Sequence, residues 1–130
     1  MKNFLIDIDG TICDDIKNED SHLYLDAKPI EGSIEQINKW YDEGHNITFF
    51  TAREEKDRAV TTLWLNNHNV KFHGLIMGKP RCLNHDDEYV WIDNRPVRGI
   101  TYRGIWGDLK ESVKKILTFG DYAFSGYIQI

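Results

Sequence analysis

Short apolar runs recur along the chain and predict a series of β-strands. They are rich in β-branched and aromatic residues and are bounded by polar or turn-forming residues, as expected for short buried strands. The predicted strands are Phe4-Leu5-Ile6, Ile47-Thr48-Phe49-Phe50-Thr51, an extended region of Val70-Lys71-Phe72 and Leu75-Ile76-Met77, then Tyr89-Val90-Trp91-Ile92, and a last strand near 99–102.

Between these runs, apolar residues recur at the spacing of a helix face. Ser33 as N-cap and Gly44 as C-terminal cap predict a helix over 33–43. A second helix is expected after the strand 47–51, and a third over about 108–118. The residues in helical register are Ile34, Ile37, Trp40 and Tyr41, then Val60, Leu63, Trp64 and Asn67, and finally Val113, Ile116 and Leu117.

Strands and helices that alternate at this length predict an α/β fold. The expected architecture is a Rossmann-like three-layer sandwich, a mostly parallel central sheet with helices on both faces. Residues 1–130 are expected to form a single domain. Residues 12–32 would form a flap, with a hairpin that includes Leu23-Tyr24-Leu25, and the apolar tail 119–130 should pack on this chain or on a second copy.

Composition and charge narrow the class of protein. The chain is 41% hydrophobic with a formal net charge of −5, so it is expected to be globular and lacks the basic footprint of a general nucleic-acid binder. Its start shows no signal peptide or membrane span, which predicts a cytoplasmic protein without a membrane partner. Cys13 and Cys82 lack a metal or disulfide spacing and are expected to be free thiols.

The run Asp7-Ile8-Asp9-Gly10-Thr11 follows the first predicted strand and carries the main chemical signal. Ligands bind at the carboxyl ends of parallel strands, so both carboxylates should face one crevice. Two close like charges repel, and they imply a shared proton or a bound metal; oxygen ligands favour Mg²⁺. A plain turn or a calcium loop is the alternative, but the twelfth position of such a loop is Asn18 where a Glu is needed.

Polar groups also follow the other predicted strands: Thr51, Lys79, and Asp93 with Asn94. Because parallel strands bring these ends together, the set would supply a nucleophile, a hydroxyl, an ammonium and a metal ligand to one phosphoryl group. Taken singly, Thr51 could be a plain strand residue, Lys79 a solvated loop lysine and Asp93 a turn residue.

The order of these motifs resembles the haloacid dehalogenase-like superfamily. The resemblance runs from Asp7 to about Pro96 and covers Asp7-Ile8-Asp9-Gly10-Thr11, Phe49-Phe50-Thr51-Ala52-Arg53, Gly78-Lys79-Pro80 and Trp91-Ile92-Asp93-Asn94. The first motif is highly specific, and the others are specific only in combination.

The resemblance implies a Mg²⁺-dependent phosphatase. It implies that Asp7 attacks phosphorus and that Asp9 acts as general acid and then general base. It further implies that Asp7, the backbone carbonyl of Asp9, and Asp93 bind Mg²⁺, while Thr51 and Lys79 bind the phosphoryl oxygens. Gly10, Thr11, Ala52, Arg53 and Asn94 are expected to support the site, and Asn94 stands where many members carry a second carboxylate.

Arg53, Arg81 and Arg95 flank three of the motifs. Each is expected either to meet the substrate or to make an ordinary surface ion pair.

Neither interval between the motifs is long enough for an inserted cap domain. We therefore expect a capless enzyme that acts on a small phosphorylated metabolite similar to a sugar phosphate, with homo-oligomer formation left open. The alternatives are a phosphatase that acts on nucleic-acid or protein ends, and a non-catalytic binding or scaffold module on the same fold.

Overall fold

The computed structural model describes residues 1–119 of the 130-residue chain. The chain has a mixed α/β fold and divides into two compact units, with the boundary between Arg81 and Cys82. The predicted packing of the apolar tail falls on residues 120–130, outside the described residues. No helix within residues 1–119 is long and apolar enough to cross a membrane.

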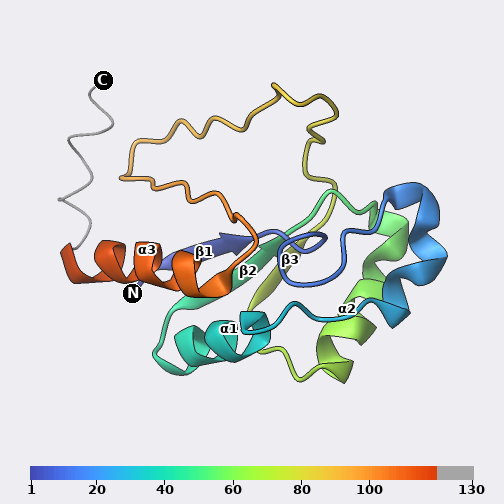
Figure 1. Cartoon of the computed structure of the whole chain (residues 1–130), viewed down its shortest axis with the longest axis horizontal. Coiled ribbons are helices and arrows are strands. Elements are labelled where there is room, and N and C mark those ends of the chain that lie inside the picture. Colours follow the sequence, from blue (N-terminus) through green and yellow to red (C-terminus); the bar gives the residue numbers. More distant parts are fainter. Residues whose placement is uncertain (120–130) are drawn as a thin grey trace. The chain divides into compact units, whose positions relative to one another are not determined.

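The first unit is built on a small parallel sheet (Figure 1). Its strands are β1 (Asn3–Ile6), β2 (Asn46–Phe50) and β3 (Gly74–Ile76), with β2 in the middle. Ile6 lies opposite Phe49, and Phe49 lies opposite Leu75. Because all three strands run in the same direction, their carboxyl ends lie at one edge, as the strand pattern predicted.

Helices link the strands and close the core. The connection from β1 to β2 carries α1 (Ser33–Asp42), and the connection from β2 to β3 carries the short 3₁₀ helix η2 (Glu55–Asp57) followed by α2 (Arg58–Asn67). Apolar residues of β2 and of both helices are buried, as expected from their spacing, and the ring of Phe4 stacks on Trp40 of α1 at 4.4 Å between centroids. The most buried of these residues are Ile37, Trp40, Ile47, Phe49, Trp64 and Leu65.

The N-cap of α1 and the buried face of α2 differ from those predicted from the sequence. The N-cap of α1 is Gly32, and the Ser33 hydroxyl instead donates toward the carbonyl of Ile30 at 2.7 Å. The prediction for Gly44 is confirmed, since this glycine follows the C-cap with a φ of 95°. On α2, Leu63 is exposed and Thr61 is buried in its place beside Trp64.

The flap is helical at its tip, so the predicted hairpin is wrong there. Its two ends do pair: Asp14 N–H donates to the Lys28 carbonyl at 3.0 Å. Between them lies η1, a 3₁₀ helix over Asn18–Asp26 with a kink at Asp20. Its one buried residue is Tyr24, whose ring lies against the guanidinium of Arg53, just beyond β2. Tertiary contacts thus outweigh the strand propensity of this segment.

In the second unit, α3 (Trp106–Phe119) confirms the third predicted helix, and Val113 is buried as expected. The predicted strands at 89–92 and 99–102 are not present; both segments are irregular. Val90 and Ile92 are 73% and 91% exposed. A strand requires a neighbouring backbone that pairs with it, and β-propensity alone does not supply one. The described sheet therefore has three strands, where we expected a larger one.

Candidate active site

The loop that follows β1 carries both motif carboxylates. Ile8 is completely buried between Asp7 and Asp9 and anchors the loop. The N–H groups of Thr11 and Ile12 both donate to the Ile8 carbonyl, at 3.0 and 2.9 Å, which closes a tight turn. Gly10 has a φ of 78°, in the left-handed region that glycine adopts without strain. The turn thus places both aspartates at the carboxyl end of the sheet.

Asp7 is held by two donors. The Thr11 hydroxyl donates to Oδ2 at 3.0 Å, and the Lys79 ammonium donates to Oδ1 at 3.0 Å. The Asp7 side chain is 37% exposed, whereas that of Lys79 is only 13% exposed. Asp7 is therefore fixed in orientation and still reachable from solvent.

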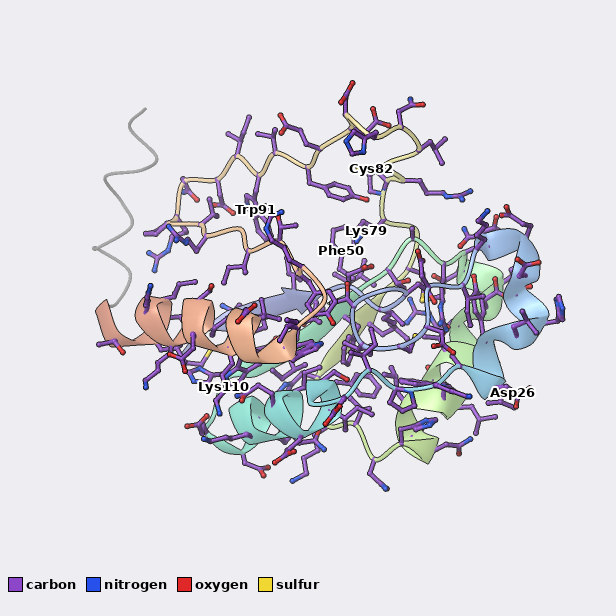
Figure 2. The ribbon with its side chains drawn as sticks, in the orientation of Figure 1. Asp26, Phe50, Lys79, Cys82, Trp91 and Lys110 are labelled. Carbon is purple, nitrogen blue, oxygen red and sulfur yellow. The ribbon has the colours of Figure 1, made fainter. Side chains whose placement is uncertain are left out.

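Backbone pairing beyond the strands brings Lys79 to this position. Thr51 N–H donates to the Ile76 carbonyl at 2.9 Å, and Lys79 N–H donates to the Thr51 carbonyl at 2.8 Å. The β2–β3 ladder is thus extended past both strands. Figure 2 shows Lys79 beside Phe50, the last residue of β2, and its ammonium lies 5.8 Å from the centre of that ring.

Asp9 is paired with Arg53. The guanidinium makes two parallel hydrogen bonds, from Nε to Oδ2 at 2.9 Å and from Nη2 to Oδ1 at 2.8 Å. Asp9 is 15% exposed and Arg53 is completely buried. The expectation that Arg53 makes an ordinary surface pair is therefore wrong, and its guanidinium faces Asp9.

Three side chains around Arg53 are contacts that the sequence did not suggest. The Tyr24 ring lies 3.7 Å from the guanidinium carbon, Arg53 Nη1 donates to the Thr61 hydroxyl at 3.1 Å, and Cys13 Sγ lies 4.0 Å from Nη2. Tyr24 comes from the flap and Thr61 from α2. No motif or spacing in the sequence marks either residue, because the contacts arise only when these elements pack.

The two cations balance the two carboxylates. Lys79 forms an ion pair with Asp7, and Arg53 forms one with Asp9. These two positive charges offset the repulsion between the carboxylates, from which we inferred a shared proton or a metal. Burial raises the pKa of the Asp9 carboxyl above its ordinary value, and the Asp7 charge adds to this, whereas the hydrogen bonds from Arg53 act in the opposite direction.

Cys13 is a structural thiol beside Asp9. It is free and buried, and burial raises its pKa to about 12. It therefore stays protonated at neutral pH, and its S–H can act as a weak donor to Asp9 Oδ1 at 3.9 Å. The prediction of free thiols is confirmed for both cysteines.

The remaining predicted residues of the first unit surround this loop. The Ala52 carbonyl accepts a hydrogen bond from Asn18 Nδ2 at 3.0 Å, which ties the flap to the end of β2. Thr51 is 1% exposed, and its hydroxyl accepts the N–H of Arg53 at 3.1 Å. A side chain added at Gly10 would meet Asp15 at 3.3 Å, so the flap approaches the loop closely.

Asp93 and Asn94 belong to the second unit, and the place of Asp93 beside Asp7 stays a prediction. Within its own segment, Asp93 accepts Trp91 Nε1 at 3.1 Å and Arg95 N–H at 3.2 Å. The hydrogen bond from Trp91 is the main reason that its pKa is lowered. Asp93 is therefore an exposed carboxylate that stays ionised at neutral pH.

The predicted metal ligands are oxygen atoms, which suit a hard cation, but the first unit contains only two of the three ligands. The part of the chain that the structure describes contains no group of three or more His, Cys, Asp or Glu side chains arranged to hold a metal. The predicted set needs only two side-chain carboxylates, Asp7 and Asp93, with the Asp9 backbone carbonyl as third ligand. All three are oxygen ligands of the kind that Mg²⁺ prefers.

A parallel sheet with two carboxylates in the loop after its first strand, and a lysine from the loop after its third, defines an α/β protein of the haloacid dehalogenase-like class. Residues 4–89, more than half of the chain, match the model of the family described as "PITM 1-3, LNS2 domain". The chain therefore belongs to this LNS2 family, within the haloacid dehalogenase-like superfamily. The match includes Asp7, Asp9 and Lys79 and ends before Asp93.

A solved structure has a similar fold. The chain is similar to a protein from Vibrio cholerae of known crystal structure, with 30% sequence identity and a TM-score of 0.56. The similarity covers 75% of this chain and 84% of that chain. Among the curated proteins, none matches the sequence.

Proposed function

We propose that the chain is a Mg²⁺-dependent phosphomonoester hydrolase that acts through an aspartyl-phosphate on Asp7. The observation that carries the proposal is the environment of Asp7: a half-buried carboxylate oriented by Thr11 and paired with Lys79. A nucleophile must be accessible and oriented, and a cation beside it favours the approach of an anionic phosphoryl group. Membership in the LNS2 family supports the same reaction class.

In the first step, one carboxylate oxygen of Asp7 forms a bond to phosphorus as the bond to the leaving oxygen breaks. Asp9 donates a proton to that leaving oxygen. Burial raises the pKa of Asp9, which is the direction that a general acid near neutral pH needs.

In the second step, the Asp9 carboxylate takes a proton from water while the water oxygen attacks phosphorus. The bond between phosphorus and Asp7 breaks, which releases phosphate and restores both aspartates.

Lys79 and Thr51 are the proposed phosphate ligands. The Lys79 ammonium already lies 3.0 Å from Asp7, so a phosphoryl group on Asp7 would meet its charge directly. The Thr51 hydroxyl accepts a bond from Arg53 N–H, and its own proton can be donated to a phosphoryl oxygen. Mg²⁺, held by Asp7, the Asp9 carbonyl and Asp93, would neutralise charge on the phosphoryl oxygens when bound.

The proposed substrate is a small phosphorylated metabolite similar to a sugar phosphate. Asp14 and Asp15 lie in the flap, where Asp15 approaches Gly10, and the formal net charge is −5. Acidic charge around the site disfavours a polyanion such as a nucleic acid.

A substrate panel tests the proposal. Purified protein is given an aryl phosphate, several sugar phosphates, nucleotides, a 3′-phosphorylated oligonucleotide and a phosphopeptide, each with Mg²⁺ and with chelator. We expect phosphate release from the aryl and sugar phosphates that depends on Mg²⁺. Preference for the oligonucleotide or phosphopeptide would favour the macromolecular alternative. Turnover that survives complete metal removal would exclude the mechanism, and no turnover on any substrate would favour a non-catalytic module.

A further inference from the structure

The guanidinium of Arg53 is enclosed by neighbouring side chains, whereas Asp9 keeps 15% of its side chain exposed. Arg53 is completely buried. Its guanidinium donates to both oxygens of Asp9, donates to Thr61, and stacks on the Tyr24 ring. Its backbone N–H donates to the Thr51 hydroxyl. Contacts from the loop after β1, the flap and α2 thus converge on one side chain.

We infer that Arg53 is a positioning residue, which fixes the carboxylate of Asp9 in the single orientation needed for proton transfer and does not itself touch the substrate. This inference rests on the proposed function. It assigns to Arg53 a role different from the phosphate contact expected from its place beside a motif. The guanidinium donates to both oxygens of Asp9 and to Thr61 and stacks on the Tyr24 ring, so its contacts are made within this chain and not with a substrate.

The geometry of the pair explains why an arginine stands here. An aspartate side chain that accepts one hydrogen bond can still rotate, whereas two parallel bonds to a planar guanidinium fix both oxygens at once. Each carboxylate oxygen keeps a further lone pair for the exchanged proton. Loss of this orientation lowers the rate because proton transfer needs the donor within hydrogen-bond reach of the leaving oxygen.

The Arg53 guanidinium is itself held in place by two successive hydrogen bonds through Thr61. The Thr61 hydroxyl accepts from Arg53 Nη1 and donates to the Asp57 carbonyl at 2.8 Å. Thr61 is 1% exposed. The far side of the guanidinium is therefore fixed to α2, and a change at Thr61 should reach Asp9 through Arg53.

The first test is Arg53→Lys, which keeps the positive charge and removes the two parallel bonds. Phenyl phosphate and 4-nitrophenyl phosphate are compared, because the poorer phenoxide leaving group needs the acid more. We expect kcat/KM for phenyl phosphate to fall about 10- to 100-fold, and that for 4-nitrophenyl phosphate by less than about threefold. Transfer of the phosphoryl group to Asp7 determines kcat/KM, so the later hydrolysis step, in which Asp9 acts as a base, does not affect this comparison. An equal loss on both substrates would overturn the inference.

Arg58→Lys is the matched control. Arg58 makes the same kind of two-bond pair, with Glu55 at 2.6 and 3.2 Å, but both residues are exposed and neither belongs to the site. We expect Arg58→Lys to leave both substrates unaffected. If Arg53→Lys does not fold, Thr61→Val takes its place, with a smaller loss that again falls mainly on phenyl phosphate.

A double-mutant comparison tests whether Arg53 acts through Asp9. In the Asp9→Asn background, Arg53→Lys should cause no further loss of kcat/KM for phenyl phosphate. An additional loss of tenfold or about that size would show that Arg53 acts independently and would overturn the inference.

An NMR measurement separates failure of the inference from failure of the proposed function. The three-bond couplings of the Asp9 β-protons should report one rotamer in the wild type and averaged rotamers in Arg53→Lys. This readout needs no turnover, so it decides the inference even if the protein hydrolyses neither aryl phosphate. Averaged couplings in the wild type, or one rotamer in both proteins, would overturn it.

Discussion

Two aspartates that are adjacent in the motif have different surroundings. Asp7 is 37% exposed beside Lys79, whereas Asp9 is 15% exposed beside a fully buried arginine. Burial and pairing thus divide the roles: the accessible carboxylate suits nucleophilic attack, and the enclosed one suits proton transfer.

Asp7→Asn should abolish turnover with little loss of stability. The amide is a poor nucleophile, so we expect kcat on an aryl phosphate to fall by at least about 10³-fold. The free energy of unfolding should change by less than about 1 kcal/mol, since the pair with Lys79 is partly exposed.

Asp42→Asn is the control for this substitution. It breaks the exposed pair of Asp42 with Lys71, 2.7 Å long, away from the site, and should leave kcat unchanged. Near-native turnover by Asp7→Asn would exclude Asp7 as the nucleophile.

His45 makes the stability of the first unit dependent on pH. Its Nδ1 accepts the Lys2 N–H at 3.0 Å, which requires the neutral ring. Burial lowers its pKa from 6.5; the N-terminus and Lys2 act in the same direction and Glu43 opposes them. A lowered folded-state pKa means that the unfolded chain binds the proton first, so this stability is present above pH 6.5 and is lost as pH falls below it.

The measurement compares the wild type with His45→Asn, in which the amide oxygen can still accept the Lys2 N–H. Between about pH 7 and about pH 5.5, the Tm of the wild type should fall further than that of the variant, by on the order of a degree or two. Parallel Tm curves would show that His45 does not contribute.

At the scale of elements, the flap is joined to the rest of the first unit at several points. Asn18 donates to the Ala52 carbonyl, Tyr24 stacks on Arg53, and Trp64 of α2 donates to the Ala27 carbonyl at 2.9 Å. These bonds tie η1 to α2 and to the end of β2. The flap therefore forms one wall of the Arg53 site.

Trp64→Phe should weaken the attachment of the flap to α2, because it removes the hydrogen bond to the Ala27 carbonyl. Both Trp64 and Ala27 are buried, so the substitution leaves a buried carbonyl without its donor and should cost about 1–3 kcal/mol. Urea unfolding measures the loss.

Trp91→Phe is the comparison, because the Trp91 N–H also bonds one oxygen acceptor but the side chain is 55% exposed. Its expected cost is smaller, since water can replace the bond. Equal costs for the two variants would mean that the Trp64–Ala27 bond does not hold the flap.

At the scale of the whole molecule, the chain is made of two units, and the residues predicted to hold the metal are divided between them. Asp7 and the Asp9 carbonyl come from the first unit, and Asp93 from the second. The expectation of one domain over residues 1–130 stays a prediction, as does the capless architecture.

Asp93→Asn should weaken metal use without destabilising the protein. Loss of a charged ligand should raise the Mg²⁺ concentration for half-maximal activity by at least about tenfold. Asp87→Asn is the control: Asp87 also accepts two backbone N–H bonds in an exposed segment of the second unit. Identical Mg²⁺ dependence in both variants would place Asp93 outside the metal site.

Much of the fold follows from local patterns in the sequence. The three strands of the first unit and the helices α1, α2 and α3 were predicted, because each depends on periodicity within a few residues. The strands at 89–92 and 99–102 and the hairpin at Leu23-Tyr24-Leu25 were wrong. In these segments the outcome depends on whether a distant partner pairs or packs with them.

The sequence alone determined the two motif carboxylates, Asp7 and Asp9, and the edge of the sheet at which they lie, since the motif is continuous and directly follows a strand. Tertiary structure decided which cation pairs with which carboxylate. Lys79 is 72 residues from Asp7, and Arg53 is 44 residues from Asp9. No local pattern encodes such pairs; they form because parallel strands align their ends and because the flap and α2 enclose one guanidinium.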